Sequence, residues 1–421
     1  MNWLFIHQNF PAQFVHVARH LAALGDAVVF ITQQRERELD RVRKIVYAPP
    51  RHHASTHPFV REFEAAVENG IAVARICTEL KRDGFVPDLV VGHNGWGEIL
   101  YIKDCWPDVP LLGYFEFFYR TTGSDLDFDP EFLPSETDRL RNRTRNAINL
   151  LGLETVDWGQ TPTEFQRSLY PERFQREISV VHEGIDTELV HPEPSTRLWL
   201  SGGLSLSRQD PIVTYSARNL EPYRGFHIMM RSLPRILERH PTARVLVVGE
   251  NGVSYGRRPT RAPSWREQLL AELGGTLDLS RVHFLGRLPY PQYLAMLRIS
   301  SAHVYLTYPF VLSWGMLEAM AAGCCIVASR TPPVEEVVRD GENGHLVDFF
   351  DTDAIADRVG EALRHPDRQE RVRAGARRTA VERYDLATVC LPAYLGLLNR
   401  LIRRDRHRSV PRPATIPASA V

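Results

Sequence analysis

The stretch Phe310-Val-Leu-Ser-Trp-Gly-Met-Leu-Glu318-Ala-Met-Ala-Ala-Gly323 decides how this chain folds. A β-rich apolar run, residues 304–306, precedes it and is typical of a buried strand. Ser313 is a favourable N-cap residue, and the apolar residues around Leu317 predict a helix that begins beside it. A buried strand that leads through a loop into a helix is the repeating unit of a parallel sheet covered by helices.

The same unit recurs along most of the sequence, in two series. Residues 193–211 lack a clear period, separate the two series and are predicted to form a linker or an exposed loop. The predicted fold is therefore α/β, with two doubly wound domains that face each other across a cleft, the expected ligand site. The predicted strands are residues 3–6, 27–31, 89–91, 111–114, the neighbourhood of Val156, 212–216, 245–248, 282–285, 304–306 and 326–328, and the predicted first-series helices are 13–24, 59–81 and 136–150.

The domain boundaries follow from these two series. We expect the first domain to cover residues 1–180 and the second residues 181–384. The amphipathic stretch 385–404 is predicted to form a helix that packs back on the first domain, and residues 405–421 to be a disordered tail. The arginines from Arg403 to Arg408 suit weak contact with anionic lipid, but the shortness of the run favours a soluble tail.

The composition excludes several classes of protein. With 421 residues, of which 43% are hydrophobic and 24% charged, the chain is predicted to form two or three globular domains. Lys and Arg together number 51, as do Asp and Glu, so no net charge attracts nucleic acid. Five scattered cysteines without a Cys-x-x-Cys pair indicate a reducing compartment and no zinc site, and the first residues do not resemble a signal peptide. The predicted location is the cytoplasm, including the inner face of its membrane.

The helix that begins near Ser313 carries two candidate ligand contacts. The backbone N–H groups of Leu312, Ser313 and Trp314 would lie free at its N-terminus and could hold a diphosphate or a hydroxyl group. Glu318 lies about one turn further along the helix, where its carboxylate could bind the two hydroxyls of a ribose. A solvent-facing carboxylate is the alternative, which the apolar neighbours of Glu318 disfavour.

Two arginines follow the first strand of the second series, in the segment Arg218-Asn-Leu-Glu-Pro-Tyr-Arg224-Gly225. Arginine offers planar, bidentate donors that match phosphate oxygens. A diphosphate site and a solvated loop explain this pair equally well.

In the first domain, two segments end predicted strands beside the expected cleft. Val90-Val-Gly-His93-Asn-Gly-Trp-Gly97 places a histidine there, as a functional group or as a structural one. The aromatic rings of Gly113-Tyr-Phe-Glu116-Phe-Phe-Tyr119 suit either an acceptor sugar platform or core packing. Further on, Asp125-x-Asp127-x-Asp129 is not predicted to bind a metal, because Pro130 stands where a calcium loop needs glycine.

Taken together, these segments resemble the retaining nucleotide-sugar glycosyltransferases of family 4, which have the GT-B fold. The resemblance covers nearly the whole chain, and the combination of segments is specific although each alone is weak. One departure is that Phe310 stands where the Glu-x7-Glu acid pair of the family has its first acid, which contacts the donor sugar. The resemblance also rests on His182-Glu-Gly-Ile-Asp186, Phe284-Leu-Gly-Arg-Leu-Pro-Tyr290 and Val334-Glu-Glu-Val-Val-Arg-Asp-Gly-Glu-Asn-Gly344.

The resemblance implies a role for each candidate residue. Arg218 and Arg224 would bind the diphosphate, Glu318 the ribose, and His93 the transferred sugar. The backbone at Leu285, Gly286 and Arg287 would face the base, and Leu312, Ser313, Trp314 and Gly315 would approach the sugar and phosphate. On the acceptor side the resemblance places the loop His7-Gln-Asn-Phe-Pro-Ala-Gln-Phe14, with the candidates Gln8, Asn9, Phe10, Ala12, Glu116 and Tyr119.

The predicted function is therefore a hexosyl- or glycosyltransferase that moves a sugar from a nucleoside diphosphate to a hydroxyl acceptor, such as a glycan, a glycolipid or a small-molecule glycoside. No metal and no further cofactor are expected, because the two arginines and the helix N-terminus supply the positive charge that the leaving diphosphate needs. The alternatives are an epimerase or a phosphorylase on the same fold, or a non-catalytic nucleotide-sugar-binding relative. The sequence leaves the oligomeric state open.

Overall fold

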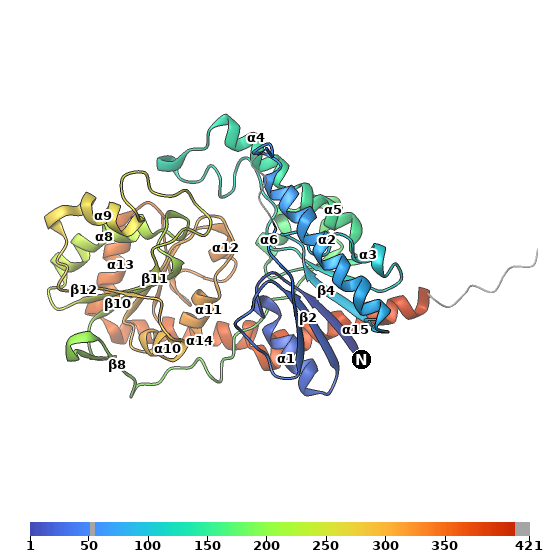
Figure 1. Cartoon of the computed structure of the whole chain (residues 1–421). Coiled ribbons are helices and arrows are strands. Elements are labelled where there is room, and N and C mark those ends of the chain that lie inside the picture. The colour runs from blue at the N-terminus through green and yellow to red at the C-terminus, as the bar shows by residue number, and fades with distance from the viewer. Residues whose placement is uncertain (51–54, 409–421) are drawn as a thin grey trace, which may run out of the picture.

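The computed structural model describes residues 1–50 and 55–408, with side chains up to Arg403. It contains two domains side by side, each built on a parallel sheet (Figure 1). The strand order is β3-β2-β1-β4-β5-β6-β7 in the first sheet and β12-β11-β10-β13-β14-β15 in the second, so both sheets are doubly wound. The predicted α/β fold with two Rossmann-like domains is confirmed.

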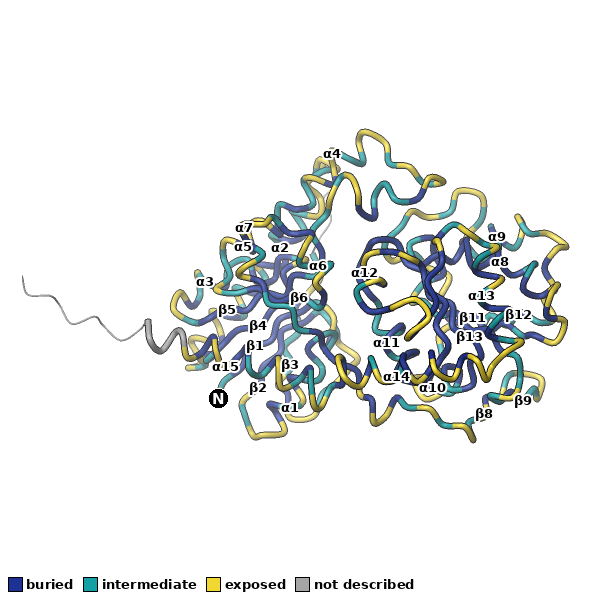
Figure 2. Tube along the Cα trace, turned by 180° about the vertical axis from the view of Figure 1, so that it is seen from behind, coloured by how far each residue is buried: buried dark blue, intermediate teal, exposed yellow. Residues whose placement is uncertain are grey.

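The first sheet is buried on both faces. Its strands are β1 (Asn2–Ile6), β2 (Ala27–Thr32), β3 (Val42–Val46), β4 (Leu89–His93), β5 (Leu111–Tyr114), β6 (Trp158–Thr161) and β7 (Ile178–Val180). Leu4 of β1 pairs with Val29 of β2 and Val90 of β4, and all three side chains are buried. Continuous apolar runs of this kind are typical of parallel strands covered on both sides, and Figure 2 shows the buried strands in dark blue.

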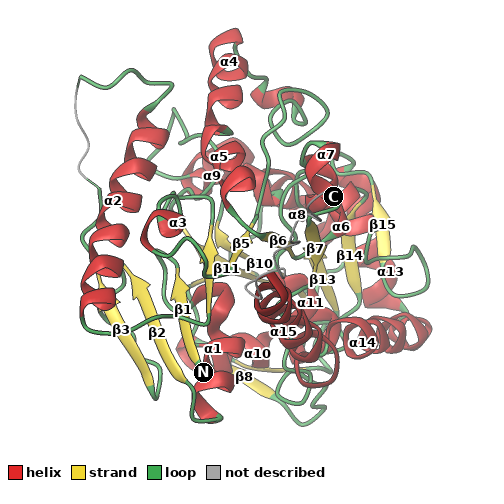
Figure 3. Cartoon of the chain, turned by 90° about the vertical axis from the view of Figure 1, so that its right-hand side faces the viewer, coloured by secondary structure: helices red, strands yellow, loops and turns green. Residues whose placement is uncertain are grey.

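Two groups of helices cover this sheet. The helices α1 (Val15–Ala23) and α15 (Leu391–Arg408) pack on one face, and α2 (Arg61–Arg82) and α3 (Ile102–Cys105) pack on the other (Figure 3). The helices α4 (Glu136–Arg145), α5 (Ala147–Thr155), α6 (Glu164–Leu169) and α7 (Glu172–Gln175) complete the domain. Ser135 and Asp138 form a capping box at the start of α4.

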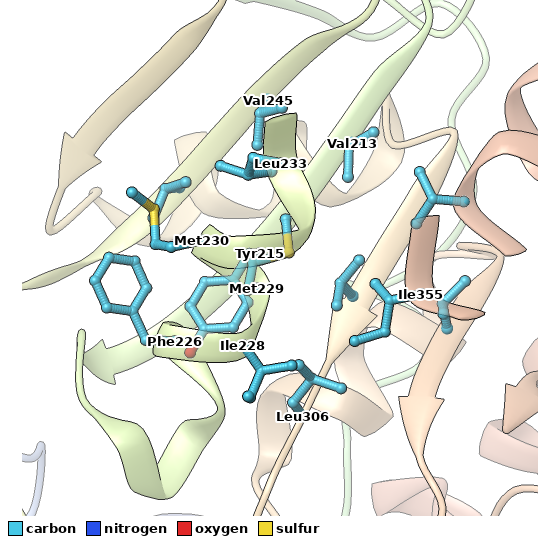
Figure 4. Close-up of a cluster of buried hydrophobic side chains, with 14 of the residues drawn as sticks. Val213, Tyr215, Phe226, Ile228, Met229, Met230, Leu233, Val245, Leu306 and Ile355 are labelled. Atoms are coloured by element: carbon cyan, nitrogen blue, oxygen red, sulfur yellow. The ribbon is translucent and has the colours of Figure 1, made fainter. Parts of the chain in front are cut away.

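The second sheet packs against α8 (Phe226–Arg239) and α13 (Thr352–Arg364). Met229, Met230 and Leu233 of α8 are fully buried, and with Val213 and Tyr215 they form the cluster in Figure 4. The strands are β10 (Ile212–Asn219), β11 (Arg244–Glu250), β12 (Val282–Gly286), β13 (Ala302–Tyr305), β14 (Ile326–Ser329) and β15 (His345–Val347). The other helices are α9 (Trp265–Leu273), α10 (Tyr290–Arg298), α11 (Trp314–Ala321), α12 (Pro332–Glu335) and α14 (Glu370–Tyr384).

Three predicted elements need correction. Residues 193–211 are not an unstructured linker, because β8 (Arg197–Trp199) and β9 (Ser205–Ser207) form an antiparallel hairpin there. Its Leu198 and Leu206 are buried in the second-domain core, which ties the hairpin down. The predicted helix 136–150 is two helices that meet at Asn146. The strand expected near Val156 begins at Trp158, and Val156 instead ends α5.

The chain crosses between the domains twice. The first sheet ends at Val180, and the chain returns at Asp385, where Ile185 and Asp385 form a bridge. The helix α15 then packs Tyr394, Leu398 and Leu401 against the first-domain core. It runs to Arg408, past the predicted start of the tail at residue 405, and the rest of the predicted tail lies outside the described residues. The side chains predicted for lipid contact between residues 404 and 408 are likewise not described.

A third connection is a long loop of the first domain, residues 120–135, which we call the strap. It leaves the first domain between β5 and α4 and reaches over to the second domain (Figure 1). The ring of Phe128 packs on Tyr308 and Phe349, each at 5.1 Å between ring centroids, and the ring of Phe132 packs on Trp265 at 5.3 Å. The strap thus adds aromatic side chains of the first domain to the core of the second.

Among the described helices, none is sufficiently long and apolar to span a bilayer.

Candidate active site

A cavity of about 740 Å³ lies on the first-domain side of the space between the domains. Its walls come from α2, α5 and the loops that follow β4 and β5. It is lined by acids, arginines, amides and aromatic rings, among them Glu62, Arg145, Asn69, Asn149, Trp96, Tyr119, His93 and Glu116. A mixed polar and aromatic lining of this kind suits a hydroxyl-rich ligand.

His93 ends β4 at the edge of this cavity, as predicted from its place after a strand. Its Nδ1 accepts a hydrogen bond from the Gly95 N–H at 3.0 Å, so the ring proton sits on Nε2. Nε2 lies 3.6 Å from Glu116 Oε2 and has no hydrogen-bond partner among the described residues. The ring is 1% exposed and stacks on Trp96 at 4.1 Å between centroids. His93 thus presents an N–H donor of fixed orientation, and no described residue accepts a hydrogen bond from it.

Glu116 follows β5 and faces His93. Its Oε1 accepts a hydrogen bond from Gln13 Nε2 at 3.4 Å, and its backbone carbonyl accepts one from Gln166 Nε2 at 2.6 Å. Burial would raise the pKa of Glu116, but His93, Arg218 and Arg224 outweigh it and hold this pKa below its usual range. The carboxylate therefore stays charged and feels the two arginines of the opposite domain.

The loop after β1 supports Glu116 through two residues that sequence reasoning missed. His7 Nδ1 accepts the Asn9 N–H at 2.9 Å, and His7 Nε2 donates to Gln13 Oε1 at 2.8 Å, which leaves the Gln13 amide N–H₂ free to reach Glu116. Burial, followed by the charge of His93, lowers the pKa of His7, which keeps this orientation. Both residues lie in the quoted segment 7–14, but only the contact with residue 116, about a hundred positions away, shows their role.

The acceptor-side candidates of this loop are only partly brought to the cavity. The prediction for Phe10 needs correction. Its ring is 2% exposed and packs on the Phe30 ring in the first-domain core, at 4.8 Å between centroids, so the ring offers no surface to an acceptor. The Gln8 carbonyl accepts hydrogen bonds from Gln33 N and Thr32 Oγ1, which anchors the loop to β2. Asn9 is exposed, and Ala12 has a left-handed φ of 46°, a strained conformation for a residue with a Cβ.

The sequence left open whether the aromatic segment after β5 lines the cavity or packs in the core, and its residues do both. Tyr119 lines the cavity, but the Arg145 guanidinium lies over its ring at 3.7 Å and covers one face. Phe115 and Phe117 are buried core residues. Glu116 is therefore the residue of this segment that presents a charged group to the cavity.

Arg218 and Arg224 come together on the second-domain wall. Both line a small cavity of about 70 Å³, together with Ser313 and Tyr305. Gly225 makes the turn that places Arg224, because its φ is 68° and a Cβ there would lie 2.2 Å from Leu306 Cβ. Arg218 is exposed at the end of β10, whereas Arg224 is buried. The two predicted cations are thus both present, one at the surface and one buried.

Arg224 is held firmly. Its Nη1 donates to Thr307 Oγ1 and to the Val311 carbonyl, each at 2.9 Å, and its guanidinium lies 5.4 Å from the Tyr255 ring centroid. Glu221 fixes the loop that carries Tyr255, because its carboxylate accepts the backbone N–H groups of residues 254–256. These contacts leave a charged side chain oriented before any ligand binds.

Phe310 lies in a cluster of aromatic rings. Its ring is 6% exposed and packs against Phe117 at 4.6 Å, Tyr255 at 4.8 Å and Tyr223 at 5.4 Å. An aromatic cluster built from both domains therefore occupies the position where the family has its first acid.

The N-terminus of α11 differs in part from the prediction. Ser313 caps the helix, since its Oγ accepts the Gly315 N–H at 3.2 Å. The Ser313 N–H is not free, however, because it donates to Tyr305 OH at 2.9 Å. The amides of Leu312 and Trp314 make no hydrogen bond within the described part of the chain, so two of the three predicted donors remain.

Trp314 also links the domains through Glu183, which the sequence did not single out. The buried Glu183 carboxylate accepts Trp314 Nε1 at 3.0 Å and Tyr114 OH, at the end of β5, at 2.6 Å. Glu183 lies in the segment 182–186 between the domains, and the polar residues around it in the sequence give no local sign of this contact.

Glu318 lies half-buried on α11 and accepts a hydrogen bond from Tyr290 OH at 2.7 Å. Burial raises the pKa of Glu318, although hydrogen bonds from Tyr290 and Tyr293 oppose the shift. Leu285, Gly286 and Arg287 end β12 and lead into α10, whose Tyr290 makes this contact. The hydrogen bond from Tyr290 therefore places Glu318, the predicted ribose contact, next to the turn at residues 285–287 that was predicted to face the base.

The aspartates of the strap bind side chains and amides of the protein. Asp125 accepts Tyr223 OH at 2.9 Å, Asp127 accepts the Gly123 amide at 3.1 Å, and Asp129 accepts His227 Nε2 at 3.0 Å. Within residues 1–50 and 55–408, no group of three His, Cys, Asp or Glu side chains is arranged to hold a metal ion.

Comparison with known proteins assigns both halves of the chain to glycosyltransferases. Residues 24–190 match the glycosyl transferase family 4 group, and residues 205–379 match glycosyl transferases group 1.

Two curated relatives have names that include inositol. The phosphatidyl-myo-inositol mannosyltransferase of Mycobacterium leprae is 35% identical over 182 residues, which are 42% of this chain and 43% of that protein, so the match spans less than half of its length. The D-inositol 3-phosphate glycosyltransferase of Thermomonospora curvata is 28% identical over 392 residues, 87% of this chain and 85% of that protein.

Solved structures share the fold at low sequence identity. The sucrose-phosphate synthase of Thermosynechococcus elongatus has a TM-score of 0.72 at 18% identity, over 96% of this chain and 99% of that one. Anabaena HepE in complex with UDP has a TM-score of 0.64 at 15% identity, over 95% and 100% of the two chains. The two family models together cover most of the chain and show that it belongs to the family 4 glycosyltransferases, and the solved structures show that it has the GT-B fold.

Proposed function

We propose that the protein is a retaining glycosyltransferase that moves a sugar from a nucleoside diphosphate to a hydroxyl acceptor without a metal ion. The observation that carries this proposal is the convergence of Arg218 and Arg224 on one small cavity of the second domain, while His93 and Glu116 line the larger cavity of the first. Cations on one wall suit a diphosphate, and a polar, aromatic cavity on the other suits a sugar and its acceptor.

In the reaction, the bond between the anomeric carbon and the diphosphate oxygen breaks while the acceptor oxygen bonds to the same carbon. The leaving diphosphate gains negative charge, which Arg218, Arg224 and the free amides at the start of α11 stabilise. The acceptor loses its proton to a leaving phosphate oxygen on the same face of the sugar, so the anomeric configuration is retained. The two arginines take the place of a metal ion in neutralising the diphosphate.

The names of the relatives support a choice of donor and acceptor to test. HepE binds UDP, and two curated relatives are named for sugar transfer to inositol-containing acceptors. We therefore propose a nucleoside diphosphate sugar as donor and a polyol such as inositol phosphate as the first acceptor to test. The ribose of the donor would bind Glu318, near the Tyr290 contact.

The test is a transfer assay with UDP- and GDP-sugars, with inositol phosphates or phosphatidylinositol as acceptor, in the presence of EDTA. We expect release of nucleoside diphosphate that depends on the acceptor, and a product whose anomeric configuration by NMR equals that of the donor. Product without acceptor would indicate an epimerase, dependence on free phosphate a phosphorylase, and donor binding without turnover a non-catalytic relative. Each of these results would overturn the proposal, as would inhibition by EDTA for its metal-independent part.

A further inference from the structure

The small cavity that holds Arg218 and Arg224 on the second-domain wall is lined by one carboxylate among the described residues, that of Glu221. The loop 308–317, which leads into α11, contains no Asp or Glu, and its Phe310 is packed among aromatic rings. Glu221 lines the same small cavity as the two arginines, but both of its oxygens accept backbone N–H groups of residues 254–256. Beside the two arginines, a sugar attached to the diphosphate would therefore find no available carboxylate from the loop 308–317 or from Glu221, while Glu318 is assigned to the ribose.

Glu116 is the carboxylate that reaches this region from the first domain. Its side chain is 32% exposed and lines the 740 Å³ cavity. Its neighbour Phe117 packs on Phe310 of the second domain at 4.6 Å between ring centroids, which brings residues 116–117 up to the opposite wall. Its contacts are long, at 3.4 Å from Gln13 Nε2 and 3.6 Å from His93 Nε2, so both oxygens can still accept a strong hydrogen bond.

His93 completes a matched pair with Glu116. Its Nε2–H is buried and has no acceptor among the described residues, while Gly95 fixes the ring through Nδ1. A hydroxyl group both accepts and donates, so one hydroxyl can accept from His93 and donate to Glu116, and a neighbouring hydroxyl can donate to the second Glu116 oxygen. A donor and an acceptor 3.6 Å apart thus fit two adjacent hydroxyls of a sugar ring.

The backbone holds this pair in place. Glu116 and Phe117 follow β5 as consecutive residues, and Phe117 packs on Phe310 while Glu116 faces the cavity. Gln166 holds the Glu116 carbonyl at 2.6 Å, and the chain His7–Gln13 reaches its carboxylate from the other side. Because Phe117 packs on Phe310, the adjacent Glu116 is also held with its carboxylate toward the cavity.

We propose that Glu116, beside His93, holds hydroxyls of the sugar that is transferred, so that the first domain supplies the carboxylate for a donor bound by the second. This inference rests on the proposed function and assigns Glu116 to the donor sugar rather than to the acceptor side.

The test compares the affinities of UDP and UDP-glucose, and of GDP and GDP-mannose, by titration calorimetry. Glu116→Gln keeps the size of the side chain and loses its charge. We expect it to weaken binding of the nucleotide sugar that the wild type prefers by about tenfold or more, the range for a lost hydrogen bond to a charged group. The affinity for the bare nucleoside diphosphate should stay within about twofold, because those contacts lie on the second domain.

Two further measurements separate a sugar contact from a structural effect. Glu154→Gln is the matched control, since Glu154 is an exposed first-domain residue on α5 outside the cavity. Donor analogues that each lack one ring hydroxyl complete a thermodynamic cycle. For a hydroxyl that Glu116 holds, its removal should weaken binding to the wild type but not to Glu116→Gln.

The outcomes distinguish this inference from the proposed function. Unchanged nucleotide-sugar affinity in Glu116→Gln, or an equal loss for the bare diphosphate, overturns the inference. A rise in acceptor KM alone also overturns it and returns Glu116 to the acceptor side, while the proposed function stands. If the wild type binds and transfers no sugar from any donor, the proposed function itself fails.

Discussion

The carboxylate of Asp129, on the strap, accepts a hydrogen bond from His227 Nε2 at 3.0 Å, although the two residues belong to different domains and both are buried. The same Asp129 oxygen also accepts the hydroxyl of Tyr308, which follows β13 of the second domain. One first-domain carboxylate thus binds α8 and the loop that leads towards Phe310.

Asp129→Asn should destabilise the protein strongly. The substitution replaces the buried carboxylate that accepts hydrogen bonds from His227 and Tyr308 with a neutral amide, and losing a hydrogen bond to a charged group costs about 1.5–3 kcal/mol. Denaturant unfolding followed by circular dichroism measures this loss. Asp108→Asn, at an exposed position of the first domain, should change the free energy of unfolding by less than about 0.5 kcal/mol. Equal stabilities of the two variants would contradict a role for the strap in holding the domains together.

The contribution of Asp129 should depend on pH in a defined direction. Burial would raise the pKa of Asp129, but hydrogen bonds from His227 and Tyr308 outweigh it and lower this pKa below the ordinary 3.8. A pKa lower in the folded state than in the unfolded state stabilises the fold above the unfolded value, and this stabilisation is lost as pH falls through the folded value. The difference in unfolding free energy between wild type and Asp129→Asn should therefore shrink below about pH 4. A difference that stays constant down to about pH 2.5 would rule this explanation out.

Arg218→Ala should lower turnover without affecting folding. Arg218 is exposed, so its loss leaves no buried cavity, whereas the loss of one donor to a developing charge costs about 10²–10³ in kcat. The measurements are kcat in the transfer assay and Tm by thermal unfolding. Arg43→Ala, at an exposed position of β3, should change neither. Near-normal turnover in Arg218→Ala would remove Arg218 from the diphosphate site.

Glu318→Gln should weaken UDP and UDP-glucose binding by the same factor, about tenfold, because the ribose is common to both. Burial raises the pKa of Glu318 above the ordinary 4.5, so wild-type affinity for UDP should fall as pH drops through that raised value. The Gln variant should show no such pH dependence. A wild-type affinity that stays flat down to pH 4.5 would contradict the ribose role, as would equal binding of UDP and its 2′-deoxy analogue in wild type.

The sequence predicts the strands that are buried on both faces and misses those that are short or half-exposed. β4 is a continuous apolar run and was expected, whereas β3 carries Arg43 and Lys44 at the edge of the sheet and has no such signature. The three-residue strands β8 and β9 are held by the burial of Leu198 and Leu206, which a local pattern does not reveal.

The residues of the site can likewise be divided into those that the sequence predicts and those that it does not. Arg218, Arg224 and Ser313 were predictable because each lies at the carboxyl end of a strand or at a helix N-terminus, where local sequence fixes the geometry. The link from His7 and Gln13 to Glu116 joins residues far apart in the chain, so no local pattern contains it. Phe10 was misplaced because its segment reaches the cleft while its ring turns into the core.

The path of α15 has a consequence for the order of folding during synthesis. Tyr394, Leu398 and Leu401 complete the core around Trp3 and Phe5, yet they are translated after the whole second domain. A nascent first domain therefore exposes an apolar face on its sheet until α15 leaves the ribosome, and that face is open to chaperones for most of translation.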